Sequence, residues 1–188
     1  MIIGKIIKFI EAIKLKRLIR KLNVSGSNNN ISSSIVIYYP ERVSLGDYIY
    51  IGPNAEINGL GGVEIMNGVI IGPNLVLHSA NHTFKNSKYI PYDETFDFRK
   101  VTIGENVWIG GNVIITPGSD IGEGCIVGAG CVISGTILPL SIVVGNPCRV
   151  IKSRDSEHYY KLKKENKIYL KEKLEKNLKP EINLNYKE

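Results

Sequence analysis

The feature that most constrains the fold is a repeat of apolar residues every six positions. Two rows of such residues run along the chain, two positions apart. Each row slips by two residues once, after Ala55 in the first row and after Ile57 in the second, and both return beyond residue 100. The first row is Ile31, Ile37, Val43, Ile49, Ala55, Val63, Val69, Leu75, Val101, Val107, Val113, Ser119, Cys125 and Cys131. The second row is Leu45, Ile51, Ile57, Ile65, Ile71, Leu77, Ile103, Ile109, Ile115, Ile121, Val127 and Ile133.

Each repeat unit predicts a short strand followed by a corner. Apolar residues at positions i and i+2 point to the same face of an extended strand. Glycine directly follows the second row in many units, and Pro-Asn comes next after Gly52 and Gly72, which is typical of a tight turn. Short strands with a corner every six residues form stacked coils of parallel strands. A β-sandwich would instead show turn signals about every 8–12 residues.

The repeat resembles that of the hexapeptide-repeat acyltransferases. Residues 101–152 read VTIGENVWIGGNVIITPGSDIGEGCIVGAGCVISGTILPLSIVVGNPCRVIK. They are similar to the C-terminal half of the galactoside, maltose and xenobiotic O-acetyltransferase branch, to which capsule and lipopolysaccharide O-acetyltransferases are related. The resemblance implies an all-β solenoid, a left-handed parallel β-helix over residues 31–152, which forms the acetyltransferase domain and carries a loop at residues 78–100.

Both ends of the chain predict helices outside the solenoid. Residues 1–22 predict a basic amphipathic helix whose apolar residues fall near one face: Ile3, Ile6, Ile7, Ile10, Ile13, Leu18 and Leu22. Such a helix fits packing against the β-helix or a neighbouring subunit, or contact with an anionic membrane surface through residues 2–22. Residues 23–30 are a polar connector, and the Lys/Glu-rich residues 153–188 predict a C-terminal helical segment.

The net charge of +6 is unevenly distributed. Residues 1–22 carry +6, residues 23–151 carry −4 and residues 152–188 carry +4. Because the β-helix region is acidic and the basic ends lack base-stacking motifs, this pattern disfavours nucleic-acid binding. No apolar stretch reaches the roughly 18 residues that span a bilayer, the N-terminus lacks a signal-peptide cleavage site, and the odd number of cysteines needs no oxidising compartment. We therefore expect a cytoplasmic protein.

The repeat is interrupted between Leu77 and Val101, and this interruption contains two of the three histidines. Long insertions in a regular fold are where functional loops concentrate. Transfer of an acyl group from a thioester to a hydroxyl needs a base, and a neutral imidazole is the usual base at neutral pH. The resemblance places His82, in Ser79-Ala80-Asn81-His82, at the position of the family's catalytic histidine.

Three further residues are expected on the acceptor side of the site, namely His78, Asn81 and Tyr92. His78 takes the place of a repeat glycine and indicates a coil corner that lines the cleft. The base needs a partner for its second ring nitrogen, and Asp93, Glu94 and Asp97 are all nearby in sequence. Nothing in the sequence selects among these three carboxylates. His158 lies in the charged C-terminal segment and is expected on the surface.

The resemblance also implies a donor site for acetyl-CoA in the groove between neighbouring β-helices. Gly111, Ala129 and Ser134 match positions that contact coenzyme A in the family, and Arg149 and Lys152 match cations near its 3′-phosphate. Trp108, the sole tryptophan, either lines this groove or packs. The chain departs from the family at Ser134-Gly135, where Thr-Lys is common, and at Lys152, where some relatives have arginine, which binds phosphate bidentately.

These features together predict an acetyl-CoA-dependent O-acetyltransferase that acts on a sugar hydroxyl of a cell-surface polysaccharide precursor. With no nucleophilic serine or cysteine indicated, we expect direct attack without an acyl-enzyme. The resemblance implies a homotrimer with sites between subunits. N-acetylation of an amino sugar and a non-catalytic β-helix scaffold are the alternatives. A three-histidine zinc site is disfavoured because His158 is remote from the other two, and no metal is expected.

Overall fold

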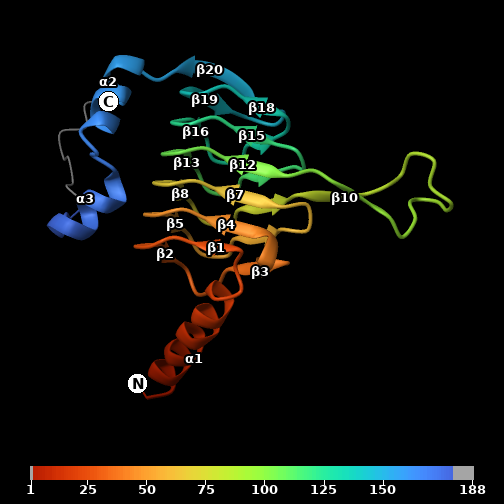
Figure 1. Ribbon diagram of the computed structural model, residues 1–188, viewed down its shortest axis with the longest axis horizontal. Helices are drawn as coiled ribbons and strands as arrows, with labels where there is room; N and C mark the ends of the chain where they lie inside the picture. The colour runs from red at the N-terminus through yellow and green to blue at the C-terminus, as the bar shows by residue number, and fades with distance from the viewer. Residues whose placement is uncertain (1, 180–188) are drawn as a thin grey trace.

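The computed structural model of the chain describes residues 2–179, with side chains from Gly4 onward (Figure 1). It begins with the helix α1 (Ile2–Ile19), continues as a stack of short strands, and ends with the helices α2 (Ser156–Lys164) and α3 (Tyr169–Lys176). Residues 180–188, the end of the predicted C-terminal segment, lie outside the described residues. Within residues 2–179, no helix is long and apolar enough to cross a membrane.

The strands form three parallel sheets that wrap around one core. Sheet 1 contains β1 (Val24–Ser25), β4 (Val43–Leu45), β7 (Val63–Ile65), β12 (Val101–Ile103), β15 (Asp120–Ile121) and β18 (Thr136–Ile137). Sheet 2 contains β2 (Asn30–Ile31), β5 (Tyr50–Ile51), β8 (Ile70–Ile71), β13 (Trp108–Ile109), β16 (Ile126–Val127), β19 (Ser141–Val144) and the antiparallel β20 (Arg149–Ser153). Sheet 3 contains β3 (Val36–Tyr38), β6 (Glu56–Asn58), β9 (Val76–His78), β14 (Ile114–Ile115) and β17 (Val132–Ile133).

Successive coils stack directly on one another. Val43 pairs with Val63, so a coil takes 20 residues (43 to 63) in the first half of the stack. Thr102 pairs with Asp120, so a coil takes 18 residues (102 to 120), or three units of six, in the second half. The predicted left-handed parallel β-helix is confirmed.

The core is the column of apolar side chains that the repeat predicts. Ile51, Ile71 and Ile109 are among the fully buried side chains, and they pair across successive coils of sheet 2, so they stack along the axis of the β-helix. Burial of each such side chain stabilises the fold by about 1.5–3 kcal/mol. Every added coil therefore extends one continuous core.

The strand register corrects one assignment within the repeat. Ile31 pairs with Ile51 and Ile37 pairs with Ile57, so both belong to the second row and not to the first. The cause is a second two-residue insertion at the corner between β3 and β4, where the 3-10 turn η1 (Pro40–Arg42) lies. Ile37 and Val43 are six residues apart only because this spacing crosses the insertion.

An antiparallel arm leaves the β-helix between the third and fourth coils. It consists of β10 (Ala80–His82) and β11 (Phe96–Phe98), joined by a loop that projects sideways from the stack (Figure 1). Asn81 pairs with Asp97 in this arm. The arm is the predicted interruption of the repeat.

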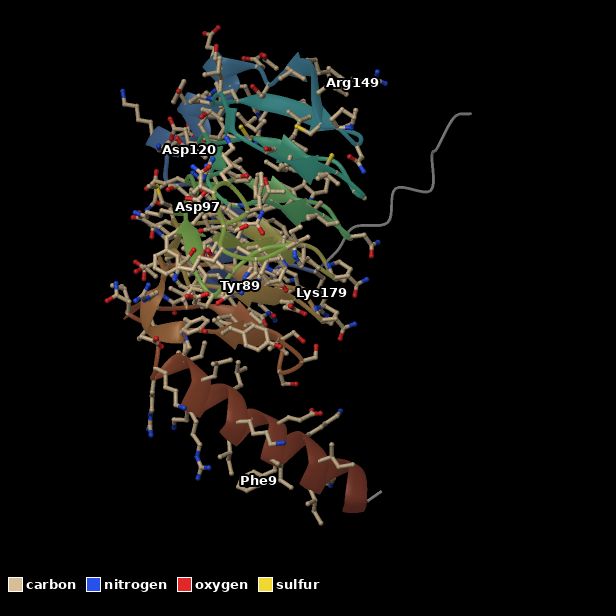
Figure 2. The ribbon with its side chains drawn as sticks, turned by 90° about the vertical axis from the view of Figure 1, so that its right-hand side faces the viewer. Phe9, Tyr89, Asp97, Asp120, Arg149 and Lys179 are labelled. Atoms are coloured by element: carbon tan, nitrogen blue, oxygen red, sulfur yellow. The ribbon has the colours of Figure 1, made fainter. Side chains whose placement is uncertain are left out.

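The helix α1 does not have the single apolar face that its sequence suggested. Leu15 and Leu18 pack against the core, together with Leu22 beyond the helix, whereas Ile6 and Ile10 are exposed. The helix projects from the first coil, and its packing contacts with the core lie near its C-terminal end (Figure 2).

The two C-terminal helices cover part of sheet 2. Asp155 caps α2, because its carboxylate accepts a hydrogen bond from the backbone N–H of His158 at 2.9 Å. Lys163 of α2 contacts both Glu105, at 2.8 Å, and Glu123. These two carboxylates raise the pKa of Lys163, with the hydrogen bond to Glu105 as the largest cause. The ion pairs attach α2 to two successive corners of the β-helix.

Candidate active site

His82 lies at the end of β10, where the arm leaves the β-helix. Its ring is stacked against Tyr92, with centroids 3.8 Å apart, and contacts the tilted ring of Phe96 at 4.5 Å. Its Nδ1 atom is buried and has no hydrogen-bond partner among the described residues. The two aromatic rings, rather than a polar partner, hold the imidazole in place.

The three nearby carboxylates each interact with other groups. Asp93 accepts hydrogen bonds from the backbone N–H of Lys88 at 3.0 Å, and from the backbone N–H and hydroxyl of Thr95 at 2.9 and 2.6 Å. The hydrogen bonds from Thr95 are the main reason that the pKa of Asp93 is lowered to about 2. Asp93 therefore organises the turn of the loop.

Glu94 and Asp97 are likewise engaged. Glu94 pairs with Lys88 at 3.0 Å, and Asp97 pairs with Arg99 at 2.8 Å. Both pairs are exposed, so each adds little to stability. The sequence left open which of the three carboxylates orients His82, and within residues 4–179 none of them binds its Nδ1 atom.

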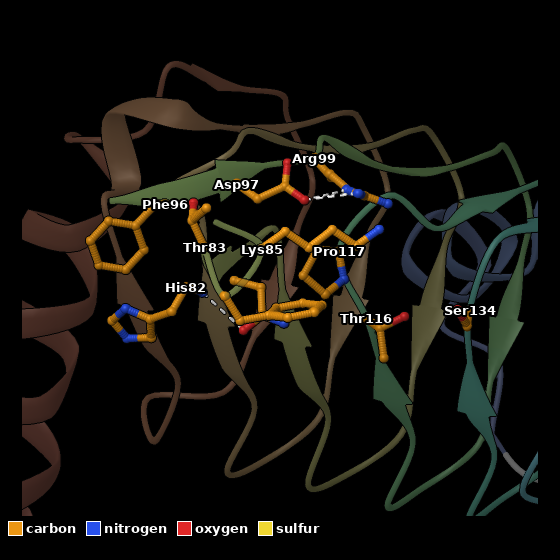
Figure 3. Close-up of a pocket in the computed structure, with 11 residues that line it drawn as sticks. His82, Thr83, Lys85, Phe96, Asp97, Arg99, Thr116, Pro117 and Ser134 are labelled. Carbon is orange, nitrogen blue, oxygen red and sulfur yellow. Dashed lines mark hydrogen bonds and ion pairs between the residues drawn. The ribbon is translucent and has the colours of Figure 1, made fainter. Parts of the chain in front are cut away.

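A cavity of about 610 Å³ lies between the arm and the neighbouring coils (Figure 3). The arm supplies Asn81, His82 and Phe96, and the β-helix corners supply Thr116 and Ser134. Ser134, a predicted donor-site residue, and His82, the predicted base, thus line one cavity although they are far apart in sequence. Its remaining lining residues are Thr83, Phe84, Lys85, Asp97, Arg99 and Pro117.

The base of the arm is fixed by a buried serine. The Ser79 hydroxyl donates to the carbonyl of Asn58 at 2.7 Å and accepts from the backbone N–H of Gly61 at 2.9 Å. The Ser79 carbonyl accepts from the backbone N–H of Arg99 at 2.9 Å, which joins the two ends of the arm. This network determines where His82, three residues further on, can lie.

The other predicted acceptor-side residues do not all line the cavity of His82. Asn81 lines the cavity, and its side-chain oxygen accepts from the backbone N–H of His82 at 2.9 Å. Tyr92 contacts His82 from the loop. His78 lies half-buried on the outer face of β9, beside Asn58 of the preceding coil, and is not among the residues that line the cavity.

The remaining donor-side residues lie elsewhere on the β-helix. Gly111 and Ala129 occupy successive corners between sheets 2 and 3, where the carbonyl of Gly111 accepts from the backbone N–H of Gly130 at 2.9 Å. Arg149 and Lys152 are exposed on β20. Trp108 is half-exposed in a second cavity, of about 670 Å³, between sheet 2 and the C-terminal helices.

Sequence reasoning missed several residues of these cavities. Lys85, Arg99 and Thr116 line the cavity of His82, and Tyr159 and Ile168 line that of Trp108 from the C-terminal segment. Thr116 follows the second-row residue Ile115 at the place of the repeat glycine, which is the one signal that could have indicated it.

The three cysteines lack the exposed, easily ionised thiol of a catalytic nucleophile. All three are free thiols, and Cys125 and Cys131 are buried. Burial raises the pKa of Cys125, Cys131 and Cys148, which favours the unreactive protonated form. Among the described residues there is also no group of three or more His, Cys, Asp or Glu side chains that could hold a metal ion.

Comparison with known proteins shows the family to which the chain belongs. Residues 100–135 match the model of the bacterial transferase hexapeptide (six repeats). Galactoside O-acetyltransferase of Escherichia coli (strain K12) is 32% identical over 159 residues, which cover 80% of this chain and 75% of that protein.

Two solved structures extend the comparison. A maltose O-acetyltransferase from Clostridium difficile 630 is 31% identical with a TM-score of 0.65, over 74% of this chain and 73% of that one. AntD, an N-acyltransferase from Bacillus cereus solved with dTDP and 3-hydroxybutyryl-CoA, is 25% identical with a TM-score of 0.66, over 83% and 95% of the two chains. From its repeat, its fold and these relatives, the chain belongs to the hexapeptide-repeat acetyltransferases.

Proposed function

We propose that this acetyltransferase transfers the acetyl group of acetyl-CoA to a hydroxyl of a sugar, with His82 as the general base. As a member of its family the chain is an acyltransferase that uses acetyl-CoA as co-substrate. The observation that carries the rest of the proposal is the shared cavity of His82 and Ser134, because it brings a base on the arm next to a β-helix corner.

The proposed reaction is a direct transfer. The acceptor oxygen attacks the thioester carbonyl while His82 takes the hydroxyl proton. The tetrahedral intermediate then collapses, the carbon–sulfur bond breaks, and the imidazolium returns its proton to the sulfur of coenzyme A. Because Nδ1 is the buried nitrogen, we assign proton transfer to Nε2. The raised pKa values of the three thiols support a mechanism without an acyl-enzyme.

The proposed donor site runs along the β-helix. Gly111, Ala129 and Ser134 would contact the pantetheine, and Trp108 would flank it from sheet 2. The exposed cations Arg149 and Lys152 on β20 would bind the phosphates at the adenosine end. These assignments rest on the resemblance and on the exposure of the residues.

We also propose a homotrimer whose sites lie between subunits. The arm exposes two large apolar side chains near its tip, those of Tyr89 and Ile90, and Ile90 is 98% exposed. A neighbouring β-helix that received this tip would bury these side chains and complete the acceptor pocket. A single-chain mass by sedimentation or light scattering would contradict this assembly.

A sugar is the acceptor that the relatives favour. The galactoside and maltose enzymes are named for O-acetylation of sugars, and the aromatic rings of Tyr92 and Phe96 beside His82 are suited to stack on a sugar ring. We place the acceptor among cell-surface polysaccharide precursors and the enzyme in the cytoplasm, with residues 31–152 as its catalytic domain. The similarity to AntD keeps N-acetylation of an amino sugar as the second candidate.

One experiment tests the proposal and separates the two candidates. Release of coenzyme A thiol is measured with acetyl-CoA and a panel of sugars, amino sugars and nucleotide-linked sugars, and each acetylated product is treated with mild alkali. An alkali-labile ester supports O-acetylation, and a stable amide supports the second candidate. Thiol release that no acceptor in the panel stimulates would contradict a sugar acceptor.

A further inference from the structure

The helix α1 has two apolar faces on opposite sides. Ile6, Phe9, Ile10 and Ile13 follow the i, i+3, i+4, i+7 spacing of one face, and all four are exposed, Phe9 most of all at 67%. Leu15 follows Ile6 by nine residues, which is two and a half helical turns, so it points the other way. That second face packs on the core, and the first has no partner among the described residues.

The free face changes from apolar to basic along the helix. Arg17 in the last turn of α1, and Arg20 one residue beyond its end, continue the same face past Ile13 at spacings of four and seven residues, and both are exposed. Glu11 is the single acidic residue of α1, and it lies off this face, where its carboxylate accepts a hydrogen bond from Ser33 at 3.3 Å. The free face therefore carries positive charge without a negative group beside it.

The free face is also directed away from the rest of the molecule. Figure 2 shows α1 projecting beyond the first coil, with Phe9 on the side of the helix turned away from the β-helix. The apolar contacts that attach the helix to the core lie at its C-terminal end. A flat surface could therefore approach the face without meeting the sheets or the arm.

We propose that the face formed by Ile6, Phe9, Ile10, Ile13, Arg17 and Arg20 docks on an anionic lipid surface. The apolar residues would enter the boundary between headgroups and acyl chains, and the two guanidinium groups would bind lipid phosphates. A second copy of the face fits less well, because it offers no acidic group to Arg17 and Arg20. The proposal does not rest on the identity of the acceptor or on the role of His82.

Both parts of the face should make a measurable contribution. A basic residue near an anionic surface improves binding about fivefold, so removal of two should weaken it about twenty-five-fold. Replacement of Ile6, Phe9 and Ile10 by serine should weaken binding by at least about a hundredfold. Each substitution removes an apolar side chain whose transfer out of water favours binding.

The test is co-flotation of the full-length protein with lipid vesicles. The wild type should float with phosphatidylcholine vesicles that contain phosphatidylglycerol, less so at high salt, and should not float with phosphatidylcholine alone. The variants Ile6→Ser/Phe9→Ser/Ile10→Ser and Arg17→Gln/Arg20→Gln should lose binding. The matched charge control, Lys161→Gln/Lys164→Gln in α2, should keep it.

Any of three results would overturn the proposal. The first is that the wild type does not float with the anionic vesicles, and the second is that the serine variant floats as well as the wild type. The third is a smaller mass in solution for the serine variant than for the wild type, because that result assigns the face to a second copy of the chain. Circular dichroism and acetyl transfer to a soluble acceptor, both unchanged in the serine variant, exclude misfolding as the cause of lost flotation.

Discussion

The ring of Tyr92 lies almost flat against the imidazole of His82, with the two planes at 16°. The two residues are ten positions apart, and the loop between them returns to the arm through this contact. The loop therefore positions the proposed base by stacking, while the buried Nδ1 of His82 has no polar partner among the described residues.

Tyr92→Leu should lower kcat about threefold to tenfold, because an aromatic pair contributes about 0.5–1.5 kcal/mol beyond its buried area. Tyr92→Phe keeps the ring and should keep kcat. Steady-state kinetics with varied acceptor check this. An unchanged kcat in Tyr92→Leu, with a rise in the acceptor KM alone, would show that Tyr92 only binds the acceptor and does not position His82.

Asp93→Asn should loosen the loop, because the three hydrogen bonds that Asp93 accepts favour its charged form. Since the pKa of Asp93 is lowered to about 2 in the folded chain, its stabilisation is complete above the unfolded value of about 3.9 and is lost as the pH falls towards 2. Protection of the Lys88 and Thr95 amides from hydrogen exchange, relative to their intrinsic rates, should follow this dependence. Glu94→Gln, which removes an exposed ion pair, is the control, and equal protection in the two variants would contradict the role given to Asp93.

Gly61→Ala should damage both stability and activity. A Cβ at this position would overlap the carbonyl oxygen of Ser79 and lie 2.9 Å from the backbone nitrogen of Arg99, at the two ends of the arm. We expect a loss of at least about 1–3 kcal/mol in thermal or denaturant unfolding. Gly4→Ala, where nothing lies within 4 Å, is the control and should be neutral or stabilising. Wild-type behaviour of Gly61→Ala would show that the corner is not tightly packed.

Arg149→Ala and Lys152→Ala should each raise the KM for acetyl-CoA about tenfold and leave kcat unchanged, because the proposed contact is to the phosphates and not to the reacting carbon. Acetyl-dephospho-CoA, which lacks the 3′-phosphate, distinguishes the contact. The wild type should bind this donor more weakly than acetyl-CoA. The variants, which already lack the contact to the phosphate, should show little further loss of affinity when the 3′-phosphate is absent. An equal penalty in all three proteins would place the cations away from the 3′-phosphate.

The six-residue period was sufficient to predict the β-helix and its core, because Ile109 and Ile115, on consecutive strands of one coil, can face a common axis only if the chain turns a corner between them. It was not sufficient for the first coil, where the insertion at Pro40–Arg42 shifts Ile31 and Ile37 into the other row without breaking the spacing. The helix α1 was predicted, but its single apolar face was wrong, because the sequence count of apolar residues merged two faces that lie on opposite sides of the helix.

The position of His82 at the start of the arm was predictable, because it depends only on the local sequence Ser79-Ala80-Asn81-His82 at the point where the repeat stops. Contacts between residues that the fold brings together were not predictable. The return of the loop sets the hydrogen bonds of Asp93 with Lys88 and Thr95, and the stacking of coils places His82 and Ser134 on one cavity, and no local sequence pattern encodes either.

The most direct test of the account is acetyl-CoA turnover by His82→Ala, measured beside coenzyme A binding. Loss of a general base should lower kcat by at least about a hundredfold, while coenzyme A binds as it does to the wild type. His158→Ala, which removes an exposed histidine of α2, should keep full activity. Turnover by His82→Ala at the wild-type rate would contradict the assignment of His82 as the base.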